Sequence, residues 1–454
     1  MPLLPSECRI IILGPAFQQN IESIDFGTKG VIERFSQIDP KVLFIFDKYY
    51  YNGKEIEVLS RSEEILNNIP SIQDLVIIAY PGTEISMKKI NTKYIKITKF
   101  TNIIDNNIDD EKMNFELFDF NHPLAILYSS GTTGKPKCIC HSTGGVLLQH
   151  MKEHMLHCDI KTNDKVFYFT TCGWMMWNWL VSGLASGAKI VIYDGSPAYP
   201  DLGSLWKMAA KVEVTHFGTS PKFLAASAKE HIIPREVANL SSLRALLSTG
   251  SPLVPEQFDW IYSNINDDFQ IASISGGTDI IGCFLGGSPL LPVRRGELQC
   301  AQLGMDVQSW DAEGNSVIGE SGELICAKPF PSMPIGFWND SDGSKYHSAY
   351  FEDFPGVWTH GDFVEMTESG GAIIHGRSDT TLNPGGVRIG TAEIYRAVEN
   401  LPEVVDAIAV GRPISADVEV VLCLKLAKDI ELTTYLFCPI FTISEINLSS
   451  SPLL

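Results

Sequence analysis

Short runs of β-branched and aromatic residues alternate with segments of helical periodicity along the first 285 residues, and this alternation constrains the fold most. The strand-like runs lie at residues 42–46, 75–79, 166–169, 190–193 and 245–248. Amphipathic segments lie between them, for example at residues 30–38, 61–69 and 205–212. Strands joined by helical crossovers form parallel sheets with helices on their faces. We therefore predict an α/β fold whose large, multi-layer N-terminal domain has mainly parallel sheets.

The pattern changes after Arg295, where strand-like segments at residues 322–327, 357–366 and 372–375 are separated by turns. These segments predict an antiparallel β subdomain. A helix-capable segment at residues 391–400 and two strand-like runs at 404–410 and 419–426 then predict the start of a small α+β C-terminal domain.

Two shorter segments carry turn signals. The pair Asn52-Gly53 between two apolar runs predicts a β-hairpin. Residues 101–112 are polar and rich in turn formers, so we expect an exposed connection there.

Charge and cysteine content exclude several classes of protein. The chain has 35 basic and 54 acidic residues, a formal net charge of −19, which disfavours nucleic acid and anionic membranes as partners. The ten cysteines show no C-x-x-C spacing and are expected to be core residues in a reducing compartment. The longest apolar stretch, residues 173–192, is interrupted by polar residues and predicts a buried helix and a strand, with no membrane span. These features indicate a cytosolic enzyme.

The segment YSSGTTGKPK at residues 128–137 follows an apolar run and has the composition of a phosphate-binding loop. Small residues let successive backbone N–H groups turn towards an anion, hydroxyls add donors, and lysines supply positive charge. The alternative is a flexible Ser/Gly/Thr turn. The Walker spacing G-x-x-x-x-G-K-[ST] is absent.

This loop resembles the signature of the acyl-adenylate-forming superfamily of AMP-binding acyl-CoA synthetases. Four further elements resemble motifs of that superfamily and follow in the same order: SGGTD at residues 275–279, GEL at 322–324, THGD at 359–362, and GRSD with GVRI at 376–379 and 386–389. The run TCGWMMWNW at residues 171–179 is similar to the acetoacetyl-CoA synthetase family within it.

The resemblance implies activation of acetoacetate by ATP and coenzyme A with Mg²⁺, through an acyl-adenylate, and a residue-by-residue assignment of the site. It implies nucleotide contacts for Ser129, Ser130, Gly131, Thr132, Thr133, Gly134, Lys135, Lys137, Gly250, Ser251, Pro252, Asp362, Arg377 and Gly386, the last admitting the pantetheine arm. Thr278 would contact the α-phosphate, Arg388 would face phosphate, and Asp379 would be the hinge of the small domain. Asp279 stands where the superfamily has Glu and would hold Mg²⁺.

The acid pocket is predicted from one glycine and one aromatic run. Acetate-activating relatives place a Trp at the position of Gly276, so the glycine is expected to leave a cavity for a longer acid. The aromatic run would supply the wall, with Asn178 or an indole N–H meeting a keto oxygen; alternatively, Trp174, Met176, Trp177 and Leu180 form a buried helix face. The predicted substrate residues are Trp174, Trp177, Asn178, Gly218, Thr219, Thr249 and Gly276.

The histidines offer weaker signals. His150, His154 and His157 share one face of a helix that Ser142 or Thr143 would cap; a metal site is conceivable, but a solvated or packed face is favoured. His141 and His360 adjoin motifs and are candidates to touch phosphate.

The pattern departs from the superfamily at both ends. We expect an AMP-binding large domain at residues 1–378 that lacks its usual N-terminal segment, the start of the small domain at 379–432, and a divergent tail at 433–454. The superfamily's P-x-T-x-S-G-K lysine is not found, which predicts weak adenylation. The alternatives are a synthetase for another short acid, such as propionate or butyrate, and a non-catalytic nucleotide-binding fragment.

Overall fold

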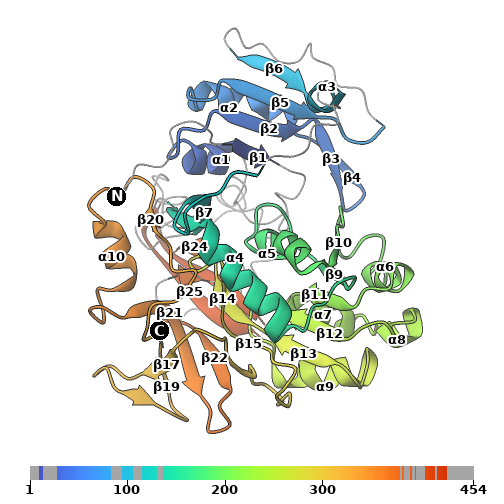
Figure 1. Cartoon of the computed structure of the whole chain (residues 1–454), viewed down its shortest axis with the longest axis vertical. Helices are drawn as coiled ribbons and strands as arrows, with labels where there is room; N and C mark the ends of the chain where they lie inside the picture. Colours follow the sequence, from blue (N-terminus) through green and yellow to red (C-terminus); the bar gives the residue numbers. More distant parts are fainter. Residues whose placement is uncertain are drawn as a thin grey trace.

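The structure is a computed structural model that describes residues 10–13, 28–82, 95–105, 115–129, 136–378, 381–382, 389–390, 394, 404–414 and 417–426. It is a mixed α/β protein with parallel and antiparallel sheets, as the sequence predicts (Figure 1).

A five-stranded parallel sheet forms the centre of the chain. Its order is β10 (Lys189–Val191), β9 (Lys165–Tyr168), β11 (His216–Thr219), β12 (Ala245–Ser248) and β13 (Gln270–Ser273). The crossovers contain α5 (Met176–Ser182), η6 (Gly183–Ser186), α6 (Ser204–Val212), α7 (Pro221–Lys229), α8 (Pro234–Val237) and α9 (Pro255–Asn264). Residues 173–192 thus form a helix and a strand, which confirms that prediction. Because all five strands are parallel, their carboxyl ends share one edge, where ligands bind in sheets of this kind.

A second parallel sheet lies at the top of Figure 1. It has the order β1 (Ile10–Leu13), β2 (Val42–Phe46), β5 (Asp74–Ile78) and β6 (Lys96–Lys99). It is accompanied by α1 (Thr28–Phe35), η3 (Leu59–Arg61), α2 (Ser62–Asn68) and α3 (Phe100–Asp105). Helix α3 occupies the start of the segment expected to be an exposed, turn-rich connection. Thr101, Asn102 and Ile104 are exposed as expected, but residues 101–105 are helical.

The predicted hairpin is confirmed in β3 (Lys48–Tyr51) and β4 (Lys54–Glu57). Asn52 and Gly53 have φ angles of 51° and 75°, the left-handed values that a tight two-residue hairpin turn requires.

Antiparallel strands occupy the rest of the molecule. One sheet consists of β20 (Gly336–Phe337), β8 (Lys137–Ser142) and β7 (Pro123–Ser129), and another of β14 (Ser275–Gly277), β15 (Gly282–Gly286) and β16 (Cys300–Ala301). The predicted β subdomain is the five-stranded sheet β18 (Ser316–Val317), β17 (Val307–Trp310), β19 (Ser321–Cys326), β21 (Trp358–Met366) and β22 (Ala372–Arg377). Helix α10 (Ser344–Tyr350) precedes β21 and shares its core.

Helix α4 (Thr143–Lys152) packs against strands β8 and β15 of two different antiparallel sheets and against helix α5. Ser142 caps it by accepting a hydrogen bond from the backbone N–H of Gly145 at 3.2 Å. The helix continues as a π-helical turn, η5 (Glu153–His157).

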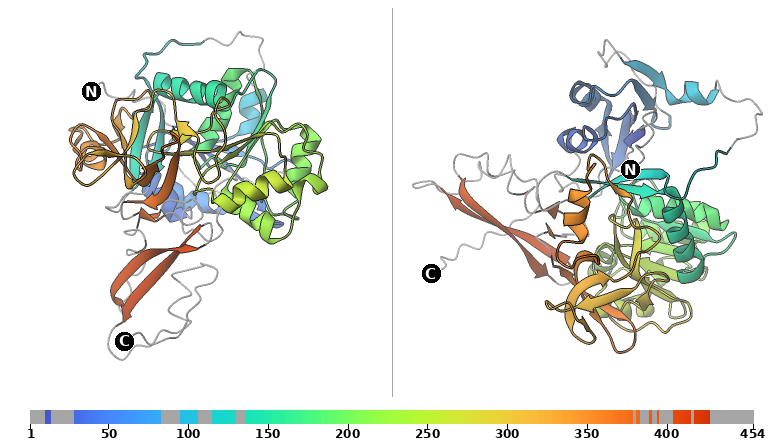
Figure 2. Two further views of the ribbon diagram at one scale, coloured as in Figure 1. Left: turned by 90° about the horizontal axis from the view of Figure 1, so that it is seen from below. Right: turned by 60° about the vertical axis from the view of Figure 1, so that its left-hand side comes forward.

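Two strand pairs complete the described chain: β23 (Thr381–Leu382) with β24 (Ile389–Gly390), and the longer β25 (Val404–Ile414) with β26 (Asp417–Leu426). Figure 2 shows the β25–β26 hairpin projecting from the other elements. The two predicted strands are confirmed, whereas the helix expected at residues 391–400 lies outside the described residues except for Ile394.

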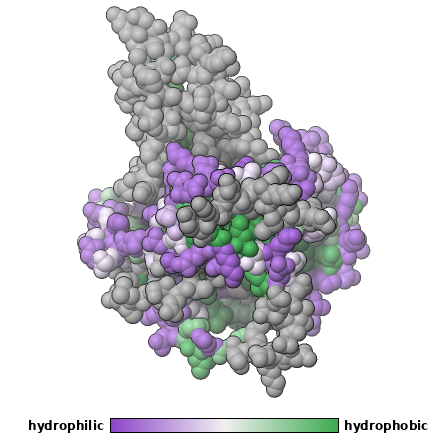
Figure 3. Space-filling view, turned by 90° about the horizontal axis from the view of Figure 1, so that it is seen from above, coloured by the Kyte–Doolittle hydropathy of each residue, from purple (hydrophilic) through white to green (hydrophobic). Residues whose placement is uncertain are grey.

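In the described part of the chain, no helix is both long and apolar enough to cross a membrane. Viewed from above, hydrophilic side chains surround small hydrophobic patches (Figure 3).

Candidate active site

The predicted phosphate loop joins two paired strands. Ser129 ends β7 and Lys137 begins β8, and the two residues are register partners in the antiparallel pair. Ser129 is buried and Lys137 is partly exposed. The pairing therefore fixes the two ends of the loop side by side. The predicted contacts Ser130, Gly131, Thr132, Thr133, Gly134 and Lys135 lie outside the described residues.

Asp279, the predicted metal ligand, lies beside these loop ends. Its carboxylate is 1% exposed. Oδ1 of Asp279 accepts hydrogen bonds from Nζ of Lys137 at 2.8 Å, the Tyr350 hydroxyl at 2.6 Å and the Ser129 hydroxyl at 3.5 Å. The structure thus brings together two motifs that are about 140 residues apart in the sequence. The lysine compensates the buried charge, which would otherwise be costly.

Tyr350 belongs to this cluster although no sequence motif marks it. Its ring stacks on Trp358, with the centroids 3.8 Å apart and the planes at 14°. Nζ of Lys137 lies 4.9 Å from the centroid of the Tyr350 ring, within the range of a cation–π contact. Sequence reasoning missed Tyr350 because only the tertiary structure brings it to Asp279.

His141, on β8, is a buried neighbour of Asp279. Burial lowers the pKa of its imidazole to about 4, against the opposing charge of Asp279. The ring is fully buried and therefore neutral at physiological pH. A neutral, buried ring does not fit the predicted candidate contact with phosphate.

Asp362 and Arg377, the predicted ribose-binding pair, are register partners on β21 and β22. Nη1 of Arg377 lies 2.7 Å from Oδ1 of Asp362, and both side chains are about nine-tenths buried. Nε2 of His360 is 3.6 Å from the other Asp362 oxygen. Glu323, on the neighbouring strand β19, accepts a hydrogen bond from the backbone N–H of Gly361 at 2.8 Å, and burial raises the pKa of its carboxyl.

Gly277 lies between the His360 ring, next to the Asp362–Arg377 pair, and Asp279. A Cβ at position 277 would lie 3.2 Å from the His360 ring and 3.6 Å from Oδ2 of Asp279. The absence of a side chain therefore lets His360 and Asp279 approach the same backbone position. Thr278, between Gly277 and Asp279, is half-buried.

The remaining described nucleotide and acid candidates lie at the carboxyl edge of the central sheet. Gly218 and Thr219 end β11, and Thr249 and Gly250 follow β12. The Thr249 hydroxyl donates to the carbonyl oxygen of Ile274 at 2.9 Å, which links the ends of β12 and β13. Gly250 has a φ of 104°, which favours glycine. Ser251 and Pro252 follow in the same loop.

The structure does not support the cavity expected at Gly276. A Cβ at this position would lie 2.6 Å from Cα of Cys283 and closer still to the carbonyl oxygen of Gly282. The antiparallel neighbour β15 fills that space with backbone, so the glycine permits close strand pairing. On β11, the face of Gly218 is likewise filled by the Tyr168 ring.

The aromatic run divides into buried and half-buried side chains. Met176 and Leu180 are in the core, together with Met175 and Trp179. The predicted pocket residues Trp174, Trp177 and Asn178 are half-buried. The alternative of a single buried face formed by Trp174, Met176, Trp177 and Leu180 is therefore correct only for Met176 and Leu180.

The three helical histidines are packed against the core. Nε2 of His150 contacts the carbonyl oxygen of Ile281 at 2.5 Å, and Nδ1 of His157 contacts that of Gly287 at 2.7 Å. His154 shares the Ser182 hydroxyl with His150. No group of three or more His, Cys, Asp or Glu side chains that would hold a metal occurs within the described ranges. The favoured prediction of a packed face is confirmed for all three residues.

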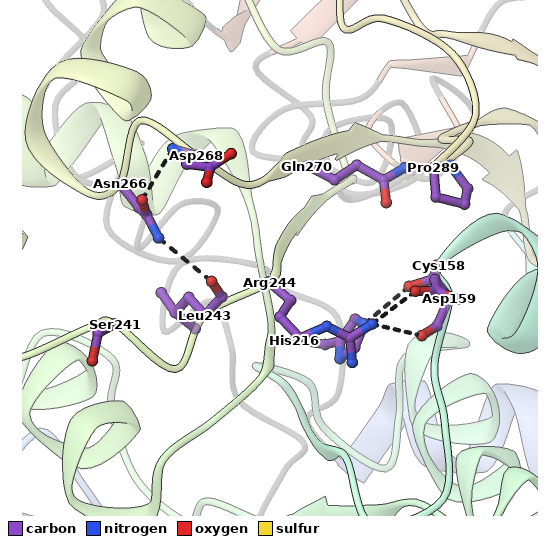
Figure 4. A pocket seen from close by; sticks show the side chains of 10 residues that line it. All are labelled: Cys158, Asp159, His216, Ser241, Leu243, Arg244, Asn266, Asp268, Gln270 and Pro289. Carbon is purple, nitrogen blue, oxygen red and sulfur yellow. Dashed lines mark hydrogen bonds and ion pairs between the residues drawn. The ribbon is translucent and has the colours of Figure 1, made fainter.

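A cavity of about 600 Å³ lies at the opposite, amino edge of the central sheet (Figure 4). Its lining includes His216 at the start of β11, Gln270 at the start of β13, and Arg244 just before β12. Arg244 donates to both carboxylate oxygens of Asp164 at 2.8 Å and to Asp159 at 2.8 Å. Arg244 is thus paired with two aspartates at the end of the sheet opposite to the candidate site.

Three predicted residues cannot be placed in this arrangement. Asp379, Gly386 and Arg388 lie outside the described residues. The site that the structure describes therefore consists of the Asp279 cluster, the Asp362–Arg377 pair and the carboxyl edge of the central sheet.

Comparison with known proteins shows the family to which this chain belongs. A family model described as "AMP-binding enzyme" matches residues 24–336, well over half of the chain, and the chain belongs to that family. It is 51% identical over 411 residues to the acetoacetyl-coenzyme A synthetase of Rhizobium meliloti (strain 1021), covering 90% of this chain and 62% of the relative. It is 47% identical over 411 residues to the acetoacetyl-CoA synthetase of Danio rerio, covering 90% of this chain and 61% of the relative.

A solved structure agrees. The acetoacetyl-CoA synthetase from Streptomyces lividans matches with a TM-score of 0.74 and 43% sequence identity, covering 94% of this chain and 64% of that chain. The chain thus spans less than two thirds of the length of these relatives.

Proposed function

We propose that this protein activates acetoacetate with ATP and transfers the acyl group to coenzyme A. A carboxylate oxygen of acetoacetate bonds to the α-phosphorus as the bond from that phosphorus to pyrophosphate breaks. The thiol sulfur of coenzyme A then bonds to the acyl carbon, AMP leaves and the thiol proton is released. The names of the relatives support the substrate, and the meeting of the loop ends with Asp279 is the observation that carries the proposal.

The residues around Asp279 fit a magnesium ion bound together with substrate phosphates. Mg²⁺ prefers oxygen ligands and is usually held by one or two carboxylates plus phosphate oxygens, with no all-protein cage. Asp279 offers one buried carboxylate beside the Ser129 hydroxyl, and the described residues contain no larger acidic cluster. Asp279 would hold the ion, which would offset the negative charge of the phosphates when bound.

Lys137 would contact the phosphates directly through its ammonium group. Its side chain is 23% exposed, whereas its partner Asp279 is 1% exposed, so the lysine is the more accessible member of the pair. Negative charge increases on the phosphate oxygens during adenylation, and a positioned ammonium stabilises that charge. The loop residues between Ser129 and Lys137, together with Thr278, would complete the phosphate contacts, and Asp362, held by Arg377, would accept the ribose hydroxyls.

The acid would lie at the carboxyl edge of the central sheet. Trp174, Trp177 and Asn178 are half-buried there, after β9, while Thr219 ends β11 and Thr249 follows β12. Apolar ring faces with a few polar groups suit a short keto acid. We include Gly218 and Gly276 as backbone that allows the strands to pack closely at this edge.

We further propose that the enzyme works in the cytosol. The small domain begins at Asp379, which would act as its hinge, with Gly386 at the pantetheine arm and Arg388 facing phosphate. The ten cysteines without C-x-x-C spacing support a reducing compartment.

The test is pyrophosphate release by the full chain with MgATP, coenzyme A and a panel of acetoacetate, acetate, propionate and butyrate. We expect acetoacetate to have the highest kcat/KM. Preference for an unsubstituted acid would contradict the substrate, and ATP binding without acid-dependent AMP formation would favour the non-catalytic alternative.

A matched pair of lysine variants tests the role of the cluster. Lys137→Met should lower acetoacetate-dependent pyrophosphate release about a hundredfold or more, because one stabilising donor is lost. Lys165→Met removes another lysine–carboxylate pair of similar length, 2.9 Å from the more exposed Glu213, at the amino edge of the sheet and should have little effect. Equal effects of the two substitutions would contradict the assignment.

A further inference from the structure

We propose that Tyr350 is a positioning residue that fixes Asp279 for the metal–nucleotide complex, an inference that rests on the proposed function. Its hydroxyl holds the carboxylate of Asp279, while its ring face supports the ammonium of Lys137. One side chain thus orients both charged groups of the phosphate site.

The hydroxyl contact is direct and buried. Tyr350 is the last residue of α10 and is 2% exposed. Its O–H donates to Oδ1 of Asp279 at 2.6 Å, the shortest of the three contacts described for that oxygen. A hydrogen bond to a charged acceptor is stronger than one between neutral groups.

Packing holds the Tyr350 ring in place. One face stacks on Trp358 at 3.8 Å, and the rings of Phe337 and Tyr346 meet it edge-on at 5.7 Å and 5.4 Å. Close packing on several sides restricts side-chain rotation. The hydroxyl is therefore presented to Asp279 from a rigid platform.

This rigidity has a consequence when nucleotide binds. Lys137 is the more exposed partner of Asp279, and phosphate oxygens compete with the carboxylate for its ammonium. When Lys137 turns towards phosphate, the Tyr350 hydroxyl continues to hold the carboxylate. The ring also offers the ammonium a face that does not move, 4.9 Å from Nζ. A carboxylate held in advance binds a cation at a lower cost in side-chain entropy.

Two conservative variants separate this role from a purely structural one. Tyr350→Phe removes only the hydroxyl and keeps the stacked ring. Tyr346→Phe is the matched control, because Tyr346 lies on the same helix, in the same aromatic cluster, and its hydroxyl donates instead to the carbonyl oxygen of Pro334 at 3.2 Å.

The measurement is ATP binding by calorimetry, with and without Mg²⁺, to the full chain. We expect Tyr350→Phe to reduce the enhancement of ATP affinity by Mg²⁺ roughly tenfold or more, because one hydrogen bond to a charged group is lost. Metal-free ATP affinity should change much less, and Tyr346→Phe should match the unsubstituted protein in both measurements. Circular dichroism and thermal melting of each variant establish that it is folded.

The outcomes distinguish this inference from the proposed function. The role of Tyr350 is overturned if Mg²⁺ enhances the ATP affinity of Tyr350→Phe as much as that of the wild type. It is also overturned if Tyr346→Phe loses this enhancement to the same extent as Tyr350→Phe. Absence of any magnesium dependence in the wild type also overturns it. Magnesium-dependent ATP binding without AMP formation from acetoacetate overturns the proposed function alone. If Tyr350→Phe does not fold, Tyr350→His, which keeps a ring and a donor, must retain part of the magnesium effect.

Discussion

Glu153 joins three elements of the core, and its hydrogen bond to Trp179 is predicted to be worth about 1–3 kcal/mol of stability. The carboxylate is 2% exposed on the π-helical turn, and burial raises its pKa. Oε1 accepts from the backbone N–H of Cys283 at 2.8 Å and from Nε2 of Gln149 at 2.6 Å. Oε2 accepts from the Trp179 indole N–H at 2.8 Å.

The perturbation is Glu153→Gln, which keeps the shape of the side chain. The amide oxygen can keep both bonds made by Oε1, so only the indole N–H of Trp179 loses its acceptor and faces another donor. A buried donor left without an acceptor costs about 1–3 kcal/mol. Removing a buried charge has an effect of its own, so the single variant does not isolate the hydrogen bond.

A double-mutant cycle in urea isolates it. The free energy of unfolding is measured for the unsubstituted protein, Glu153→Gln, Trp179→Phe and the double variant, and the coupling should be about 1–3 kcal/mol. The control cycle replaces Trp179 with Trp206, a fully buried tryptophan whose indole N–H has no hydrogen-bond partner among the described residues. That cycle should be additive within about 0.5 kcal/mol. Additivity in the Trp179 cycle as well would refute the reasoning.

Two further predictions concern stability. Gly276→Ala should lower the melting temperature strongly, because overpacking against backbone costs about 1–3 kcal/mol or more. Gly277→Ala should cost less, because the nearest neighbour of the added Cβ is a side chain at 3.2 Å. The reverse order in thermal melts would contradict the strand geometry. The pKa values of the buried His141, His150 and His154 are lowered to about 4, 4 and 3. As the pH falls below about 6.5, the unfolded chain therefore gains protons that the folded chain does not. Each of these histidines then lowers the free energy of unfolding by about 1.4 kcal/mol per pH unit. Burial raises the pKa of the Glu153 carboxyl, and this group therefore opposes the effect of the three histidines. Because the histidines outnumber it, urea unfolding should show lower stability at pH 5.5 than at pH 7, and an unchanged or higher stability would refute this account.

Strand positions could be predicted from the sequence because buried strands are short, continuous runs of mainly apolar residues. Residues 42–46 and 245–248 coincide with β2 and β12. Helix α3 could not be predicted from local composition, since a long-range contact stabilises it. Its first residue, Phe100, packs edge-on against Phe44 of β2, with the ring centroids 6.2 Å apart.

The candidate site was only partly predictable for a related reason. The motifs identified Ser129, Lys137 and Asp279 because a hydroxyl, an ammonium and a carboxylate group within such motifs indicate phosphate and metal binding. Tyr350 lies 71 positions from Asp279 and has no local signal, so its contact exists only in the folded chain. At Gly276 the sequence shows that a side chain is absent, but only the structure shows that the β15 backbone fills the space.

The two edges of the central sheet give the experimenter separate places to intervene. Arg244, clamped by two aspartates, belongs to the amino edge, whereas the nucleotide and acid candidates belong to the carboxyl edge. Position 268, where an exposed aspartate lines the amino-edge cavity, is therefore a suitable place to introduce a residue that carries a fluorescent label. A dye there would report unfolding of the sheet while leaving the phosphate site open to substrates.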